Sequence, residues 1–243
     1  MDHASDHVPH PQGDEERAER KRIERVYRAY TSDPHYSRIW GGDVARFLIE
    51  WEWEGIVRAL RAEGCNTATT RLLDLGAGEG GDCDRFRQVG MRPDRVVAID
   101  LVWEFLCSAR RYHPWLAALQ ADGALLPFRD GAFDVVYQST MLSSVLDRER
   151  RARILGEVRR VLGPGGLFLS YDTRYPNPWN RNTRPVSAAE FRAAFPGWRV
   201  SVRTCTPIPQ LVRLFWFLPR TVWRAIERVP PLRSHLLAVV RKP

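Results

Sequence analysis

The chain has 243 residues, of which 44% are hydrophobic and 27% charged, as is ordinary for a globular protein with one substantial core. Its start is polar, and no run approaches the roughly 20 apolar residues of a membrane span, so neither a secretory signal nor a membrane anchor is expected. The net charge of +8 comes from arginines spread along the chain, which argues against a nucleic-acid substrate.

The cysteines Cys65, Cys83, Cys107 and Cys205 form no CxxC pair and show no zinc-site spacing with histidine. No metal site is therefore expected. Without an export signal, we expect reduced thiols in a cytoplasmic protein.

The N-terminal region predicts a tail followed by two helices. Residues 1–13 are rich in His, Pro and Asp and are expected to be disordered. Apolar residues at helical spacing predict one helix over 14–30 and a second over 43–62. Residues 14–64 are thus expected to form a helical cap on a main domain that spans 65–243.

The main domain alternates between strand and helix patterns. The predicted strands are 71–75, 95–100, 116–120, 133–138 and 167–171, and the predicted helices between them are 82–88, 103–112 and 148–162. This alternation is typical of a doubly wound α/β fold, in which helices cover both faces of a parallel sheet.

The last third predicts two more strands, 198–204 and 236–241, with 205–233 as a possible lid insertion between them. Within it, residues 208–228 interleave apolar side chains with arginines, and Pro219 interrupts the pattern. Three interpretations stay open: a lid over an acceptor pocket, a basic aromatic surface that touches a membrane, or an ordinary helix packed on the sheet.

The strongest local signal is a glycine-rich turn between the first strand and its helix. Gly76, Gly78 and Gly81 satisfy the GxGxxG pattern, which lets the backbone bend sharply and approach a ligand. A plain glycine turn is the structural alternative.

Two acids follow the next strands. Asp100 ends the second strand, where a carboxylate can accept hydrogen bonds from both hydroxyls of a ribose. Asp122 follows the third strand near the same sheet edge and can accept from the exocyclic amine of adenine. Each acid alone could instead be a helix cap or a turn residue.

The segments around these residues resemble the class I S-adenosylmethionine (SAM)-dependent methyltransferase family. The resemblance rests on residues 72–80 (LLDLGAGEG), 96–101 (VVAIDL), 120–136 (QADGALLPFRDGAFDVV) and 160–172 (RVLGPGGLFLSYD). It implies a Rossmann-like sheet of seven strands in the order 3-2-1-4-5-7-6, with strand 7 antiparallel. It also implies SAM as the cofactor.

The resemblance assigns roles by position. The implied cofactor-binding residues are Asp74, Gly76, Ala77, Gly78, Asp100, Leu101, Asp122, Gly123 and Gln138. Asp74 would order the glycine loop and the SAM amino group, and Gly76 and Gly78 would approach the methionine end. Asp100 would hold the ribose and Asp122 the adenine, while Gln138 would border the methyl group.

Further segments resemble a bacterial subgroup of this family that is often encoded with glycan or secondary-metabolite genes. They are 138–140 (QST), 143–147 (SSVLD), 171–172 (YD), 177–180 (NPWN) and 231–236 (PLRSHL). Thr173-Arg174 departs from the Phe-Arg of that subgroup, which leaves the substrate pocket open. The resemblance implies a small-molecule acceptor: a glycan precursor, a lipid-linked compound or a secondary metabolite.

An oxygen acceptor would benefit from a general base, and Asp172 and His235 are the candidates. A loop cap and a structural histidine are the respective alternatives. Two other functions stay open: a nicotinamide-dependent Rossmann oxidoreductase, and a SAM-binding protein without turnover. The expected assembly is a monomer or a homodimer.

Overall fold

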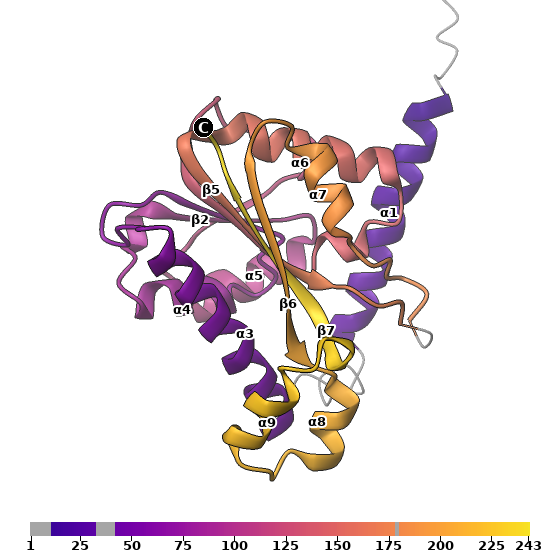
Figure 1. Cartoon of the computed structure of the whole chain (residues 1–243). Coiled ribbons are helices and arrows are strands. Elements are labelled where there is room, and N and C mark those ends of the chain that lie inside the picture. Colours follow the sequence, from indigo (N-terminus) through magenta and orange to yellow (C-terminus); the bar gives the residue numbers. More distant parts are fainter. Residues whose placement is uncertain (1–10, 33–41, 178–179) are drawn as a thin grey trace, which may run out of the picture.

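The computed structural model describes residues 11–32, 42–177 and 180–243, shown in Figure 1. The strands are β1 (Leu72–Leu75), β2 (Val96–Asp100), β3 (Ala117–Gln120), β4 (Phe133–Ser139), β5 (Leu162–Thr173), β6 (Arg199–Pro207) and β7 (Arg233–Arg241). The helices are α1 (Pro11–Ser32), α3 (Gly42–Ala62), α4 (Gly81–Gln88), α5 (Trp103–Tyr112), α6 (Arg148–Val161), α7 (Ala188–Ala194), α8 (Pro209–Phe215) and α9 (Arg220–Ile226). Single 3-10 turns are η1 (Pro93–Arg95), η2 (Leu142–Ser144) and η3 (Pro230–Leu232).

The strands form one seven-stranded sheet in the order β3-β2-β1-β4-β5-β7-β6. Strands β1 to β5 pair in parallel, whereas β7 is antiparallel to both β5 and β6. The predicted fold class and strand order are therefore confirmed. The chain winds outward from β1 in one direction and from β4 in the other, and ligands bind at such a switch point, beyond the carboxyl ends of the strands.

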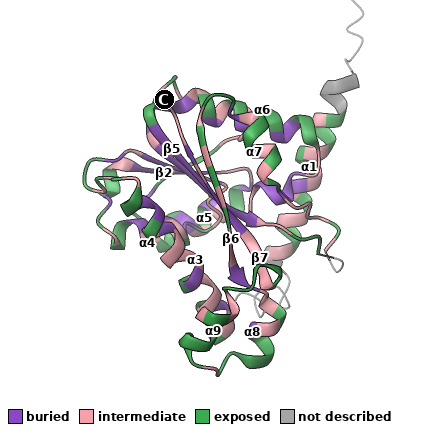
Figure 2. Ribbon diagram, in the orientation of Figure 1, coloured by how far each residue is buried: buried purple, intermediate pink, exposed green. Residues whose placement is uncertain are grey.

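Helices cover both faces of the sheet, and Figure 2 shows the buried residues concentrated on the strands between them. On one face, Ile56 of α3, Phe86 of α4 and Leu106 of α5 are buried against the sheet. On the other, α6 and α7 pack, with Ile23 of α1 in the same cluster.

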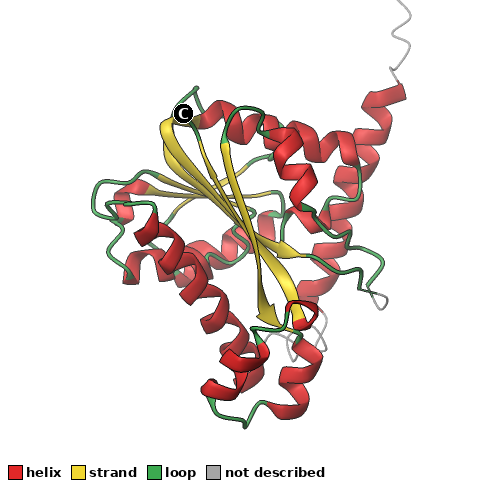
Figure 3. Ribbon diagram, viewed as in Figure 1, coloured by secondary structure: helices red, strands yellow, loops and turns green. Residues whose placement is uncertain are grey.

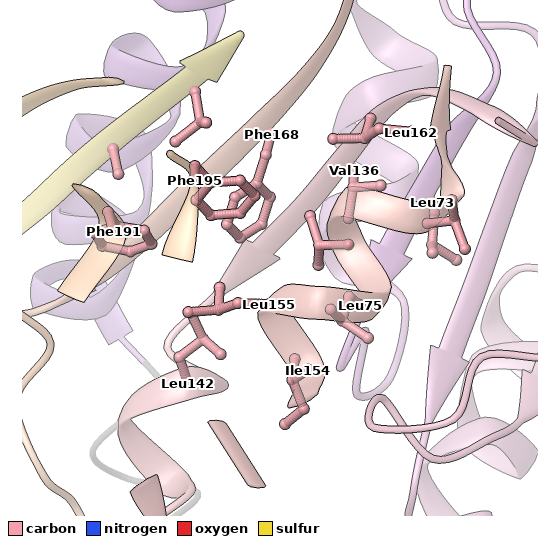
Figure 4. Close-up of a cluster of buried hydrophobic side chains, with 14 of the residues drawn as sticks. Leu73, Leu75, Val136, Leu142, Ile154, Leu155, Leu162, Phe168, Phe191 and Phe195 are labelled. Carbon is pink, nitrogen blue, oxygen red and sulfur yellow. The ribbon is translucent and has the colours of Figure 1, made fainter. Parts of the chain in front are cut away.

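The central strands of the sheet are held by apolar packing on the side that α6 covers. Side chains from the strands meet those of α6 and α7 in Figure 4; they are Leu73, Leu75, Val136, Phe168, Ile154, Leu155, Phe191 and Phe195. Burying each such side chain stabilises the fold by roughly 1.5–3 kcal/mol. The carboxyl ends of β1 and β4, which carry the candidate site, are thereby held in place.

The elements differ from the sequence prediction in several places. Helix α1 begins at Pro11, within the segment 1–13 that was expected to be disordered, and residues 1–10 of that segment lie outside the described part of the chain. Strand β7 begins at Arg233, whereas the predicted strand began at 236. Figure 3 shows the helices and strands as the structure has them. Strand β5 begins at Leu162, whereas the predicted strand began at 167. The Gly163–Gly166 segment belongs to the strand, and the pairing register between β5 and β4 shifts across it. Helix α7 was not predicted. Its start is marked by Ser187, whose side chain accepts a hydrogen bond from the Glu190 amide.

The 208–228 segment forms two short helices, α8 and α9, because Pro219 caps the second. Val212 and Trp223 are buried against Trp51 of α3, so the segment packs as part of the fold. Its other face leaves apolar side chains at the surface; they are Leu214, Phe215, Trp216, Phe217 and Val222. In the described part of the chain, no helix has the length and apolar character needed to cross a membrane.

Candidate functional site

The β1–α4 loop bends back over the end of β2. The Gly76 and Ala77 amides both donate to the Ile99 carbonyl, at 2.9 Å each. Gly76 has φ +78°, and a Cβ atom there would come within 2.5 Å of Met141 Cγ. Gly78 follows with φ +54°. Only glycine adopts this tight turn without strain, and it leaves a bare backbone surface.

Asp100 lies at the carboxyl end of β2. One carboxylate oxygen accepts from the Gly78 amide at 2.9 Å and the other from the Val102 amide at 2.8 Å. Burial raises the pKa of Asp100, and these amides oppose that rise. An ionised carboxylate offers about four acceptor positions, so about two are left for a ligand. That capacity matches the two hydroxyls of a ribose.

Asp122, which follows β3, is held by an arginine that the sequence analysis missed. Arg150 of α6 donates to both carboxylate oxygens of Asp122, at 2.6 and 2.7 Å, and the Ala124 amide donates to Oδ1 at 2.9 Å. About one acceptor position of Asp122 is left, on Oδ2. The side chain of Arg150 is only 3% exposed. The ion pair therefore fixes the direction in which Asp122 faces a ligand.

A cavity of about 640 Å³ joins these features, a volume within the usual range of small-molecule sites. Its lining includes seven of the predicted cofactor-binding residues: Gly76, Ala77, Gly78, Asp100, Leu101, Asp122 and Gly123. Ile23, Tyr27 and Tyr30 of α1 and Ile49 and Glu52 of α3 also line it. The two N-terminal helices thus form part of the same site.

Asp74 and Gln138 lie beneath this cavity rather than in its lining. Asp74 is buried in β1 and accepts a hydrogen bond from Cys83 Sγ at 3.2 Å. Burial, with the nearby Asp82, raises the pKa of Asp74 well above its usual value. The Gln138 side-chain oxygen accepts from the Met141 amide at 2.9 Å and so holds the loop after β4. Both residues therefore support the cavity indirectly, by holding neighbouring segments in place.

The two predicted bases, Asp172 and His235, also lie outside the lining. Asp172 is fully buried and accepts from the Ser143 amide at 3.1 Å, and burial raises its pKa to about 6. His235 stacks on the Tyr171 ring, with centroids 4.7 Å apart, and burial lowers its pKa to about 4. Neither side chain reaches the cavity in this arrangement, so a catalytic role for them stays a prediction that the geometry does not support.

Glu52 is one of the cavity-lining acids that the sequence analysis missed. Its Oε1 accepts from Ser139 Oγ at 2.7 Å, at the end of β4, and lies 3.1 Å from Tyr137 OH. That hydroxyl also lies 3.0 Å from Asp82 Oδ2, and its single proton can serve only one carboxylate at a time. Burial, and then the charge of Asp82, raises the pKa of Glu52 to about 8. Glu52 is thus a cavity-lining acid that changes its charge near neutral pH.

Comparison with known proteins identifies the family. A family model described as "Methyltransferase domain" matches residues 73–170. A demethylmenaquinone methyltransferase of Streptomyces griseus is 34% identical over 119 residues, which are 49% of each chain. A tRNA U34 carboxymethyltransferase of Pseudomonas aeruginosa is 30% identical over 224 residues, covering 80% of this chain and 67% of that protein. The chain belongs to the class I SAM-dependent methyltransferases.

Solved structures of low sequence identity share the methyltransferase fold. A putative sarcosine dimethylglycine methyltransferase from Galdieria sulphuraria has a TM-score of 0.62 at 16% identity, covering 87% of this chain and 98% of that one. A second structure is the Haloferax volcanii complex between the Trm112 methyltransferase activator and a putative methyltransferase. It has a TM-score of 0.61 at 23% identity, and the match covers 85% of this chain and 93% of that one.

SAM is the cofactor of this methyltransferase family, and the residues present fit it. At Gly78 the glycine turn leaves open space, because no atom lies within 4 Å of the position that a Cβ atom would take, and Asp100 keeps about two acceptor positions for a diol. Family membership sets aside the nicotinamide-dependent alternative. Among the residues with described positions, no group of three or more His, Cys, Asp or Glu side chains could hold a metal ion.

Proposed function

We propose that this methyltransferase transfers the methyl group of SAM to a small-molecule acceptor bound beside Glu52 and Ser139. The observation that carries the proposal is the single cavity lined by the glycine turn, by Asp100 and Asp122, and by Glu52. It offers partners for an adenosyl group and, in the same space, a titratable acid.

The cofactor would be held by groups at three strand ends. Asp100 would accept from the ribose hydroxyls, Asp122 from the adenine amine, and the turn at Gly76 and Gly78 would make room for the methionine part. When bound, SAM supplies a methyl group that its sulfonium has already activated. The protein then has mainly to align the acceptor and exclude water, and positioning alone contributes several powers of ten in rate.

A bounded cavity favours a small acceptor over a polymer. Helix α1 is tied down beside the site, because Tyr27 OH hydrogen-bonds Ser144 Oγ and Glu19 accepts from the Leu146 amide at 2.7 Å. A glycan precursor, a lipid-linked compound or a secondary metabolite would suit such a space. The name of the Streptomyces relative denotes demethylmenaquinone as its substrate, whereas that of the Pseudomonas relative denotes tRNA. Transfer RNA is therefore the second acceptor class to test.

Glu52 is the residue best placed to take a proton from the acceptor. It lies in the cavity wall and contacts Ser139 at the strand end that borders the predicted methyl position. A carboxylate with a pKa of about 8 accepts a proton more readily than an ordinary one. We propose Glu52 as the general base for an oxygen or protonated amine acceptor.

The test is SAM turnover with methyl-labelled cofactor against two pools, a small-metabolite extract and total tRNA. We expect label in a small molecule and none in tRNA, and Asp100→Asn should reduce the labelling about tenfold or more at a SAM concentration below saturation. Asp94→Asn is the matched control, because the Asp94 side chain is 61% exposed and forms an ion pair with Arg92 at the surface. Label in tRNA alone would reject the small-molecule acceptor, and SAM binding without turnover on either pool would favour the non-catalytic alternative.

We further propose a cytoplasmic protein that touches membranes through residues 208–228, as would suit a lipid-linked acceptor. Support comes from the exposed Leu214, Trp216 and Phe217 beside the arginines of the same segment, and from the four free cysteines. Flotation with anionic liposomes tests it. Binding that Trp216→Ser with Phe217→Ser abolishes would support the contact, and no binding of the wild type would remove it.

A further inference from the structure

A second cavity, of about 530 Å³, lies between α3, α9 and the β5-β7-β6 part of the sheet. Five arginines line it: Arg58, Arg203, Arg224, Arg228 and Arg233. The acids in its lining are Glu52 and Glu227. These arginines come from α3, from β6 and β7, and from α9 with the residues after it, so only the folded chain brings them together.

Four of these arginines have no carboxylate partner among the acids that the structure describes. Arg224 is neutralised by Glu54 and Glu227. Arg203, however, donates to the Gly55 carbonyl, and Arg233 to the Glu227 carbonyl and Thr204 Oγ1. Arg58 and Arg228 have no ion pair with any acid whose position the structure gives. Guanidinium groups of like charge around one cavity repel one another, and a bound anion would relieve that repulsion.

The chemistry of this lining favours a phosphate. A single carboxylate is satisfied by one bidentate arginine, whereas a phosphate or pyrophosphate presents enough oxygens for several guanidinium forks at once. Glu52 lines this cavity as well as the cofactor cavity. An anionic group held among the arginines would therefore place a neighbouring part of its molecule beside Glu52, at the boundary with the cofactor cavity.

We propose that the second cavity binds a phosphate or pyrophosphate group of the methyl acceptor. This inference rests on the proposed function and narrows its substrate to a phosphate-bearing class. The phosphate can belong to a soluble metabolite or to a lipid headgroup. Titration with inorganic pyrophosphate probes the first source, and binding to phosphatidylglycerol vesicles probes the second.

The experiment titrates the full-length protein with inorganic pyrophosphate by calorimetry and measures binding to vesicles of phosphatidylglycerol or of phosphatidylcholine. The test variant is Arg58→Gln with Arg228→Gln, since both side chains are exposed and unpaired and their loss should leave the fold intact. The matched control is Arg111→Gln with Arg192→Gln, which removes the same charge from exposed positions outside both cavities.

We expect the test variant to weaken pyrophosphate binding about tenfold or more, with the control unchanged. If the source is a headgroup, the test variant should instead lose binding to phosphatidylglycerol vesicles, which the control should keep. No binding of either probe by the wild type, or an equal loss in both variants, would overturn the proposal. A parallel titration with SAM separates this result from the proposed function, because SAM binding should be the same in all three proteins.

Discussion

Glu52 Oε1 and Ser139 Oγ lie 2.7 Å apart where helix α3 meets the carboxyl end of β4. This contact joins a segment far upstream in the chain to the strand end that borders the predicted methyl position. It also puts a titratable group with a pKa of about 8 into the wall that the two cavities share.

The first prediction concerns activity. If Glu52 takes the acceptor proton, kcat should rise with pH until about pH 8 and then level off, because the carboxylate form is the active one. Glu52→Gln should lower kcat about a hundredfold and lose this pH dependence. Steady-state rates from pH 6 to 9 test this, with Glu50→Gln, on an exposed part of the same helix, as control. A Glu52→Gln profile that still rises through pH 8 would point to another base.

The second prediction concerns stability. Between its ordinary pKa of 4.5 and about 8, Glu52 is ionised in the unfolded chain but protonated in the native protein. The native state then binds more protons, so the free energy of unfolding should fall as pH rises through this interval. Glu52→Gln lacks this dependence, so its stability relative to the wild type should increase between pH 5 and 8. Urea unfolding at pH 5 and pH 8 measures the difference in unfolding free energy between the variant and the wild type. A difference that is the same at both pH values would contradict the raised pKa of Glu52.

The third prediction concerns the glycine turn. Gly76→Ala should destabilise the protein by about 2 kcal/mol or more and weaken SAM binding, because φ is +78° and the new Cβ atom would overlap Met141. Gly78→Ala is the matched comparison, since its φ is +54° but no atom lies within 4 Å of a Cβ there. Gly78→Ala should lower the free energy of unfolding by only about 1 kcal/mol. Equal effects in thermal unfolding would mean that the contact with Met141 is unimportant.

Much of this site follows from local sequence, and the rest depends on tertiary packing. Asp100 and Asp122 could be predicted because strand ends in a parallel sheet meet at one edge. Glu52 could not be predicted as a site residue, because Glu50, Glu52 and Glu54 alternate with tryptophans in the same helix. Their spacing does not indicate which of the three glutamates faces the cavity.

Arg150 was missed for a related reason. It lies in an arginine-rich helix, and only packing buries this side chain against an acid 28 residues away. The strand and helix pattern, by contrast, correctly predicted the doubly wound α/β class, and the family resemblance correctly implied the strand order. Helix α5 has the predicted bounds. Where the pattern was wrong, at Gly163–Gly166, sheet pairing overrode the turn preference of the glycines.

The fourth prediction concerns the buried ion pair. Arg150→Met should destabilise the protein by roughly 3 kcal/mol, because it leaves the Asp122 carboxylate without its charged partner. Adding Asp122→Asn should recover part of this loss, since the uncompensated charge is then gone. Urea unfolding of the two single variants and the double variant tests it. Additive losses would show that the two side chains act independently.

We propose that Asp100 and Asp122 hold the adenosyl group of SAM beside the glycine turn. The decisive measurement is calorimetric titration with SAM of the Asp100→Asn and Asp122→Asn variants, with Asp94→Asn as control. Each cavity variant should lose about tenfold or more in SAM affinity, while the control binds like the wild type. Unchanged SAM affinity in both cavity variants would show that these two carboxylates do not hold the adenosyl group.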